Sequence, residues 1–194
     1  AQRLGLEVAV LDPDPAAPCA HLTPRFTVGS FQAEADVLAF AQAHALHVLT
    51  CEIEAVSTPA LRALAARGLR VFPQAGVLET IQDKGRQKLF YQAHGLPTAP
   101  FQLIEAPEAL QGLYEAGALA LPAILKLRRG GYDGRGVLAL STPADLPRAM
   151  AAFGGQPCLV EARVAIRREV AVLVARSATG EVAAFPAVEQ AFHP

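Results

Sequence analysis

The strongest constraint on the fold of this chain is an alternation of short apolar runs with helix-like segments over its first 73 residues. Such an alternation is typical of a parallel sheet covered by helices. The first apolar run ends in Asp12-Pro13-Asp14-Pro15, a turn-forming sequence. The fold class predicted for this part is therefore α/β. We expect strands at residues 7–11, 25–28, 47–50 and 69–73, and helices at residues 33–45 and 59–67.

Acidic side chains follow two of these expected strands at their carboxyl ends. Asp12 and Asp14 follow the first strand, and Glu52 and Glu54 directly follow residues 47–50. Open parallel sheets bind their ligands at this edge. The glutamates have a second interpretation, because the dipole at the N-terminus of the next helix favours carboxylates. The edge is a candidate ligand site, and both interpretations of Glu52 and Glu54 stay open.

A long helix rich in Gln, Lys and Arg is expected over residues 77–94, where Gly95-Leu96-Pro97 ends it. We take this helix as a domain boundary. The domains expected are an α/β domain at residues 1–76, a linker helix at 77–97, a small lid domain at 98–160 and the start of a large lobe at 161–194. Beyond the linker we expect strands at residues 123–127, 137–140, 158–161 and 169–175 and one through 185, with helices at 107–117 and 145–153.

The charge balance excludes one class of partner. The 17 basic and 18 acidic residues nearly cancel, which leaves no broad positive surface for a nucleic-acid backbone. No apolar run reaches the roughly 18 residues of a membrane span, and the N-terminus shows no targeting pattern. The three cysteines have no metal-binding or disulfide spacing. We expect a cytoplasmic protein with no nucleic-acid or membrane partner.

The stretch of residues 124–137 carries the strongest functional signal. Lys126 lies in an apolar strand, and four glycines follow within residues 130–136. A buried ammonium needs an anionic partner, and a glycine-rich backbone can present N–H groups to phosphate. A plain β-hairpin with a mobile loop is the alternative, but it does not require Arg128, Arg129 and Arg135. The Gly-Lys-Ser/Thr ending of a Walker A loop is absent.

This stretch, Lys-Leu-Arg-Arg-Gly-Gly-Tyr-Asp-Gly-Arg-Gly from Lys126, resembles the nucleotide loop of the 5-(carboxyamino)imidazole ribonucleotide synthase family. The resemblance extends in the family's order along the chain. It covers residues 12–14, 52–54, 82–84 with 88, 95–98, 160–161 and 169. It implies an ATP-grasp fold with an N-terminal Rossmann-like (pre-ATP-grasp) domain, truncated at both ends.

The resemblance also implies a reaction and its partners. The family is an ATP-dependent carbon–nitrogen ligase: ATP phosphorylates bicarbonate, and the carboxyphosphate formed carboxylates 5-aminoimidazole ribonucleotide. The cofactors implied are ATP and Mg²⁺, with the magnesium ligands expected beyond Pro194 and none within this chain. A homodimer is expected by the same resemblance.

Site residues are carried over one by one. Lys84 and Lys126 would hold the ATP phosphates, although many relatives carry arginine at Lys84. Glu161, Glu169 and His193 would line the adenine and ribose pocket. On the substrate side the resemblance implies Glu52, with Asp133 and Arg135 as the residues nearest the chemistry. The loop expected to close over the nucleotide comprises Gly131, Tyr132, Asp133, Gly134, Arg135, Gly136 and Val137.

Several of these residues also have an interpretation that involves no ligand. Glu161 fits a solvated strand end, Glu169 a surface ion pair with Arg167 or Arg168, and His193 a surface imidazole. The first strand of the family, with its glycine-rich turn, is missing, so we expect this chain alone to be incomplete for catalysis. Two other functions stay open: a formate-dependent glycinamide ribonucleotide transformylase, whose loop is serine-rich, and a non-catalytic nucleotide-binding fragment.

Overall fold

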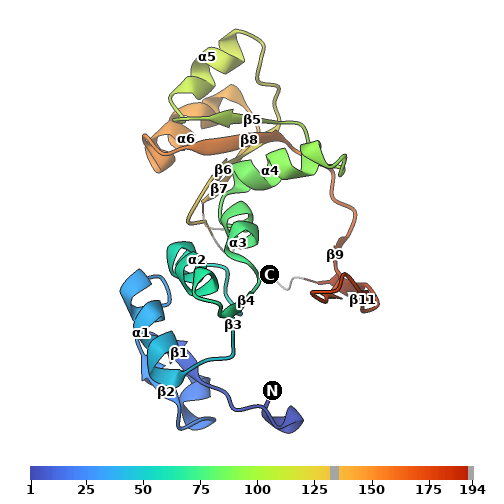
Figure 1. Ribbon diagram of the computed structural model, residues 1–194. Coiled ribbons are helices and arrows are strands. Elements are labelled where there is room, and N and C mark those ends of the chain that lie inside the picture. The colour runs from blue at the N-terminus through green and yellow to red at the C-terminus, as the bar shows by residue number, and fades with distance from the viewer. Residues whose placement is uncertain (132–135, 192–194) are drawn as a thin grey trace.

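The computed structural model describes residues 1–131 and 136–191. Its N-terminal part is an α/β unit with two pairs of parallel strands (Figure 1). The predicted parallel pairing is confirmed, but no hydrogen bonds join the two pairs among the described residues. The unit contains η1 (Gln2–Leu4), β1 (Val10–Asp12), η2 (Pro18–His21), β2 (Phe26–Val28), α1 (Glu34–His44), β3 (Val48–Thr50), α2 (Thr58–Ala66) and β4 (Arg70–Phe72).

Local signals position the helices of this unit over its strands. Ser57 caps α2 by accepting a hydrogen bond from the Ala60 amide at 3.4 Å, and Pro59 lies in the first turn, where its missing N–H costs nothing. Side chains from α1, α2 and α3 then pack on Leu49 and Val71 of the central strands. The first strand begins at Val10 rather than at the expected residue 7. Residues 7–9 therefore lie outside the strand ladder.

The expected long helix over residues 77–94 is wrong in one respect, because it is two helices. These are α3 (Ala75–Ile81) and α4 (Lys84–Ala93). Asp83 has an extended backbone, with φ −122° and ψ 105°, and its side chain accepts hydrogen bonds from the Gly85 and Arg86 amides. An aspartate in this position starts a helix, so the chain restarts at Lys84 in a new direction.

The second unit is a four-stranded antiparallel sheet in the order β5-β8-β6-β7. One face packs on α5 and α6 around Leu110, Leu125, Leu140 and Phe153, and α4 lies on the opposite face (Figure 1). The first strand of this sheet was not expected from the sequence. The elements are β5 (Phe101–Ile104), α5 (Ala109–Glu115), β6 (Ala123–Leu127), β7 (Val137–Leu140), η3 (Pro143–Asp145), α6 (Leu146–Phe153) and β8 (Cys158–Ala162).

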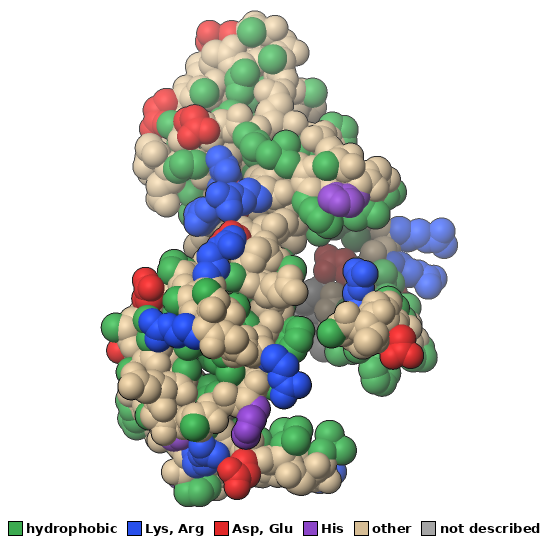
Figure 2. All heavy atoms as spheres, viewed as in Figure 1, with side chains coloured by type: hydrophobic (Ala, Val, Ile, Leu, Met, Phe, Trp, Pro, Cys, Tyr) green, Lys and Arg blue, Asp and Glu red, His purple; other side chains and the backbone are tan. Residues whose placement is uncertain are grey.

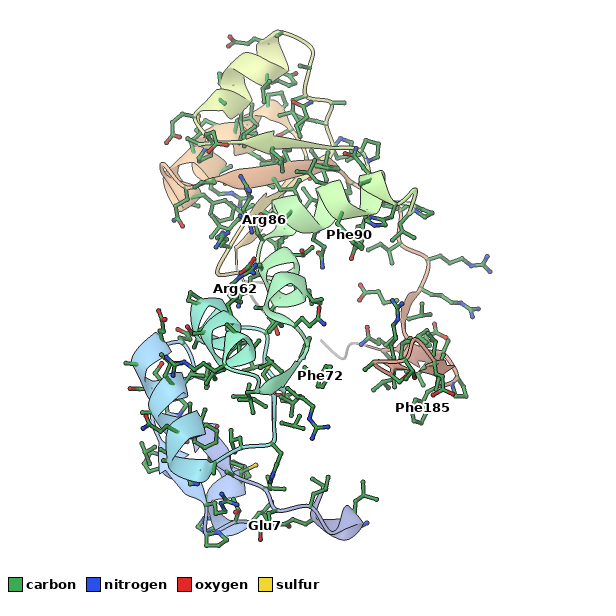
Figure 3. The ribbon with its side chains drawn as sticks, in the orientation of Figure 1. Glu7, Arg62, Phe72, Arg86, Phe90 and Phe185 are labelled. Carbon is green, nitrogen blue, oxygen red and sulfur yellow. The ribbon has the colours of Figure 1, made fainter. Side chains whose placement is uncertain are left out.

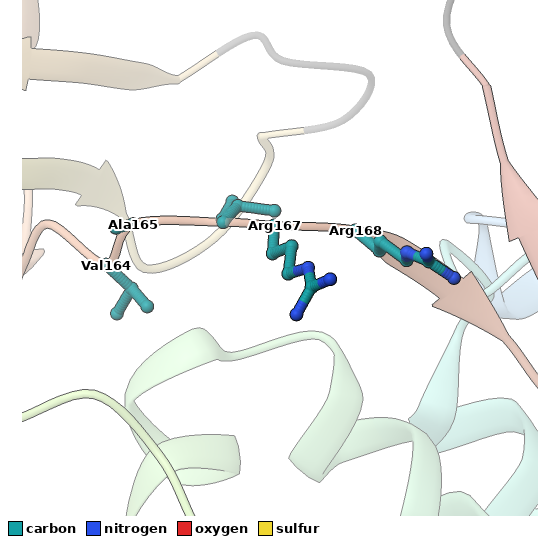
Figure 4. A pocket seen from close by; sticks show the side chains of 5 residues that line it. Val164, Ala165, Arg167 and Arg168 are labelled. Atoms are coloured by element: carbon teal, nitrogen blue, oxygen red, sulfur yellow. The ribbon is translucent and has the colours of Figure 1, made fainter.

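Residues 163–191 form a third, mostly exposed region. The strand expected at residues 169–175 divides into β9 (Glu169–Ala171) and β10 (Val174–Arg176), which pair with β12 (Val188–Gln190) and β11 (Val182–Ala184). The strand expected through residue 185 ends at Ala184. Apolar side chains in this region face solvent, among them Val170 of β9 with 62% exposure and Phe185, just after β11, with 65% (Figure 3). A shallow cavity of about 700 Å³ lies beside residues 164–168, the extended segment that leads into β9 (Figure 4).

No described helix combines the length and apolar character needed to span a bilayer. The three cysteines are free, and only Cys158 is buried. Burial, with a smaller contribution from Glu108, raises the pKa of the Cys158 thiol to about 11. This thiol is therefore uncharged at neutral pH and packs as a core side chain.

Candidate functional site

Charged side chains gather where α4 crosses the sheet. Residues alternate between the two faces of a strand, so Leu125 enters the core while Lys126 points toward α4. Glu161 lies opposite Ile124 on the neighbouring strand and projects from the same face as Lys126. The helix adds Lys84 and Lys88, one turn apart on one side of α4. Several Lys and Arg side chains are visible on the surface near this junction (Figure 2).

Glu161 is the centre of the first cluster. Its side chain is 9% exposed, and it forms ion pairs with Lys126 and, at 2.5 Å, with Lys88. Burial alone would raise the pKa of the Glu161 carboxyl, but hydrogen bonds from Lys126 and Lys88 outweigh it and hold this pKa below the ordinary value. The solvated strand end suggested for Glu161 is therefore not what the structure shows.

The Glu161 cluster carries an uncompensated positive charge, because two ammonium groups share one carboxylate. The Lys126 side chain keeps 28% of its exposure, whereas Lys88 keeps 13%. Lys88 also donates to Thr98 Oγ1 at 2.6 Å and lies 5.6 Å from the centre of the Phe101 ring. Lys126 is consequently the more accessible cation, in a position to meet an anionic ligand. Sequence reasoning gave Lys88 no role, and its helical spacing from Lys84 was the available signal.

Asp83 is the centre of the second cluster, which joins α4 to the start of the glycine-rich loop. Its side chain is 3% exposed. Arg128 donates from Nε to Oδ1 at 3.1 Å and from Nη2 to Oδ2 at 2.9 Å, and Arg129 donates from Nε to Oδ2 at 3.3 Å. Burial would raise the pKa of the Asp83 carboxyl, but the Arg128 and backbone hydrogen bonds lower it overall. Arg128 and Arg129, expected to favour an anionic ligand, are here partners of a protein carboxylate.

Lys84 lies against the same loop. Its amide donates to the Arg128 carbonyl at 2.9 Å, and its Nζ donates to the Gly131 carbonyl at 3.1 Å. At the far side of the loop, Gly136 has φ 72°, and a Cβ there would lie 3.1 Å from Leu127 Cδ1 and 3.3 Å from Gly131 Cα. The positive φ favours glycine at this position, and a side chain there would also crowd Leu127 and Gly131. The predicted site residues Lys84, Gly131 and Gly136 are thus brought together at the base of the loop.

A cavity of about 380 Å³ opens between this loop and the N-terminal unit. Its lining includes Glu54, Lys84 and Gly131, but not Glu52, which the resemblance assigned to substrate. Gln82 fixes one wall by donating from Nε2 to the Glu54 and Val56 carbonyls at 2.7 and 2.8 Å. Helix α2 begins at Thr58, and its first turn contains no acidic residue. Glu52 and Glu54 are therefore not the carboxylates of a helix N-terminus.

The remaining predicted site residues either lie outside the two clusters or fall in the part of the chain that the structure does not describe. Val137 begins β7 opposite Lys126, and Glu169 begins β9 with an exposed side chain. Of the neighbouring arginines, Arg168 has its Nε 3.9 Å from Glu189 Oε1. Tyr132, Asp133, Gly134, Arg135 and His193 lie outside the described residues.

Metal-ligating side chains do not cluster in the part of the chain that the structure describes. Residues 1–131 and 136–191 contain no group of three or more His, Cys, Asp or Glu able to hold an ion. The two buried carboxylates at the junction, Asp83 and Glu161, are each engaged by cations of the protein. These residues do not fit a magnesium site.

Comparison with protein families identifies the class of this chain. Residues 89–193 match the ATP-grasp domain model, and residues 1–82 match the ribonucleotide synthetase preATP-grasp domain model. The chain therefore belongs to the ATP-grasp family, and the predicted fold class is confirmed.

Individual relatives confirm the resemblance to 5-(carboxyamino)imidazole ribonucleotide synthases that was noted in the sequence. N5-carboxyaminoimidazole ribonucleotide synthase of Synechococcus elongatus is 38% identical over 97% of this chain and 47% of its own length. The crystal structure of the synthetase from Thermus thermophilus, also 38% identical, superposes with a TM-score of 0.82 over 99% of this chain and 50% of that one.

A third similar structure contains bound ligands. The enzyme of Aspergillus clavatus, in complex with ADP and 5-aminoimidazole ribonucleotide, is 29% identical and superposes with a TM-score of 0.85. The match covers 100% of this chain and 49% of that enzyme. The chain spans about half the length of the relatives it matches.

Proposed function

We propose that this chain is the nucleotide- and substrate-binding half of an ATP-dependent carbon–nitrogen ligase that carboxylates 5-aminoimidazole ribonucleotide. The observation that carries the proposal is that two lysines lie at the base of a glycine-rich loop: Lys84 donates to the Gly131 carbonyl, and Lys126 pairs with the buried Glu161. The sequence similarity of this chain to N5-carboxyaminoimidazole ribonucleotide synthases, 36 to 38% identity over 97% of the chain, supports the same function.

The proposed reaction has two steps. A bicarbonate oxygen attacks the γ-phosphorus of ATP, and ADP leaves as carboxyphosphate forms. The exocyclic amine of the ribonucleotide then attacks the carboxyl carbon, phosphate leaves and the amine loses a proton, which gives the carbamate. Both steps move negative charge on phosphoryl oxygens, so fixed cations near those oxygens lower the barriers.

Lys126 and Lys84 are the cations proposed for this role. Each offers a compact charge with movable donors, which suits phosphate oxygens. On phosphate binding, Lys126 would exchange part of its contact with Glu161 for the ligand, and Lys84 would leave the Gly131 carbonyl. Lys88 keeps Glu161 ionised during this exchange, because one ammonium group remains beside the carboxylate.

Glu161 and Glu169 are proposed for the adenine and ribose side, with His193 beyond them. The residues proposed for the ribonucleotide are Glu52, Asp133 and Arg135, and the cavity between the loop and the N-terminal unit also brings Glu54 to this side. The closing segment proposed is residues 131–137. We assign no step to Mg²⁺, since the described residues do not assemble ligands for it.

We also propose the domain division expected from the sequence, and the presence of two separate cores supports it. One core draws its buried residues from 37–78, and a separate core draws them from 104–160. We retain an α/β domain at 1–76, a linker at 77–97, a lid at 98–160 and a further lobe from 161. We also propose that the full-length protein is a homodimer in the cytoplasm. Sedimentation of the full-length protein measures the oligomeric state.

Product analysis of the full-length protein tests the function. ATP, bicarbonate and 5-aminoimidazole ribonucleotide are supplied together, and then each is omitted in turn. We expect ADP release at the full rate only with all three, and incorporation of labelled bicarbonate into the carbamate. ADP release that needs formate and glycinamide ribonucleotide would instead support the transformylase. Nucleotide binding without turnover would support the non-catalytic function.

A further inference from the structure

The Asp83 side chain connects the start of α4 with Arg128 and Arg129, the two arginines that begin the glycine-rich loop. It caps α4 through the Gly85 and Arg86 amides, at 2.9 and 3.2 Å, and it binds both arginines that begin the loop. Arg128 donates twice, so five hydrogen bonds in all saturate a carboxylate that is almost fully buried. The side chain therefore has no free acceptor for a ligand, and its neighbours determine its role.

The adjacent glycine shows how closely the arginine is fitted. A Cβ on Gly85 would lie 2.7 Å from Arg128 Nε, 3.0 Å from Leu103 Cδ2 and 3.1 Å from Asp83 Oδ1. Only glycine leaves room for the guanidinium to lie across the first turn of α4 on its way to Asp83. This crowding accounts for a glycine at the second position of α4.

The backbone completes the attachment. The Lys84 amide donates to the Arg128 carbonyl at 2.9 Å, and the Arg128 amide donates to the Pro157 carbonyl at 3.1 Å. Residue 128 is thus held by α4 on one side and by the turn before β8 on the other. Lys126 lies two residues before this point and Gly131 three residues after it.

We propose that Asp83, with the space left by Gly85, is a positioning residue that fixes the root of the glycine-rich loop and so aligns Lys84 with Lys126. This inference rests on the proposed nucleotide-binding function of the two lysines. It assigns Arg128 to the protein rather than to the phosphate. Displacing Arg128 from Asp83 should weaken nucleotide binding although neither lysine is altered.

The sharpest test is Gly85→Ala in the full-length protein, because it displaces Arg128 without removing any charge. Gly112→Ala in α5 is the matched control, since a Cβ there meets nothing within 4 Å. Asp83→Asn is the second variant and removes the charge at nearly constant volume. We expect the Kd for ATP, from calorimetric titration, to rise about tenfold in both variants and to stay within twofold in the control.

Amide hydrogen exchange separates positioning from a general loss of structure. Faster exchange confined to residues 128–131 and the first turn of α4, with β5 and α5 unchanged, supports the proposal. Faster exchange throughout the sheet, or a Kd for ATP within twofold of wild type in Gly85→Ala, overturns it. If the wild-type protein binds no ATP, the nucleotide function fails, and the exchange pattern at residues 128–131 still decides whether Asp83 fixes the loop.

Discussion

The two carboxylate-centred clusters beside α4 each place two cations around one carboxylate, but they differ in the kind of cation and in its exposure. Asp83 accepts hydrogen bonds from two arginines and two amides, and its side chain is 3% exposed. Glu161 faces two lysines, one of which keeps 28% of its exposure. Guanidinium groups suit fixed, forked pairing, whereas ammonium groups exchange partners easily. The comparison indicates that the Asp83 cluster holds structure and the Glu161 cluster can receive a ligand.

Asp83→Ala should have the largest effect on stability. It leaves Arg128 with only the exposed Glu105, 3.9 Å away, as a counter-charge, and it removes the cap of α4. Removing one partner of a buried ion pair costs about 3 to 5 kcal/mol, and the 20% exposure of Arg128 places the expected loss near 3 kcal/mol. Urea denaturation measures it. A loss below about 1 kcal/mol would mean that the Asp83 cluster is no more structural than a surface pair.

Lys126→Ala should act on ligand binding rather than on folding, because Lys88 still neutralises Glu161. Loss of a charged hydrogen bond to phosphate costs about 1.5 to 3 kcal/mol, so kcat/KM for ATP should fall by roughly 10- to 150-fold. The KM for the ribonucleotide should change little. Kinetics with each substrate varied in turn provide the measurement, and equal effects on both substrates would remove the distinction between the clusters.

The two clusters should also respond to acid in the same direction. Both carboxyls have a pKa lowered in the folded protein, so their stabilisation is fully present above the unfolded values near pH 4. It is lost as pH falls through the lower folded values. The stability difference between wild type and Asp83→Asn should be constant above about pH 5 and shrink below pH 4. A difference that grows on acidification would contradict the assignment.

We expect the smallest effect on stability at the ion pair of Arg62 with Glu79 on the surface. Its atoms lie within 2.6 to 2.7 Å, as close as those in the clusters, but the Arg62 side chain is 60% exposed. Solvent screens such a pair, and short distances alone do not give stability. We expect Arg62→Ala to leave the melting temperature unchanged within error. A drop like that of Asp83→Ala would show that burial is not what separates these sites.

The sequence predicted the elements with strong local signals. The limits of β6 and β7 agree residue for residue, because an apolar run ends at Leu127 and the glycines stop at Gly136. The break before α4 was missed although Asp83 is a common helix cap. A capping aspartate resembles any other acidic residue inside a stretch of good helix formers, so the pattern alone favoured one long helix.

For the candidate site, the sequence singled out residues but not the contacts between them. The structure places Lys84, Lys126 and Glu161 at the junction of α4 with the sheet, yet nothing local in the sequence connects Asp83 to Arg128, 45 residues away. The ion pair of Lys126 with Glu161 likewise depends on the pairing of β6 with β8. Strand β5 was also missed, and its Phe101 and Leu103 form part of the face on which α4 lies.

A crystal structure of the full-length protein with ADP tests the central claim most directly. The account predicts that Lys126 Nζ and Lys84 Nζ lie within hydrogen-bonding distance of the phosphate oxygens, with Lys84 released from the Gly131 carbonyl. The contacts between Asp83 and Arg128 should be unchanged. Phosphates bound by Arg128 and Arg129, with Asp83 released and Lys126 still paired to Glu161, would contradict it.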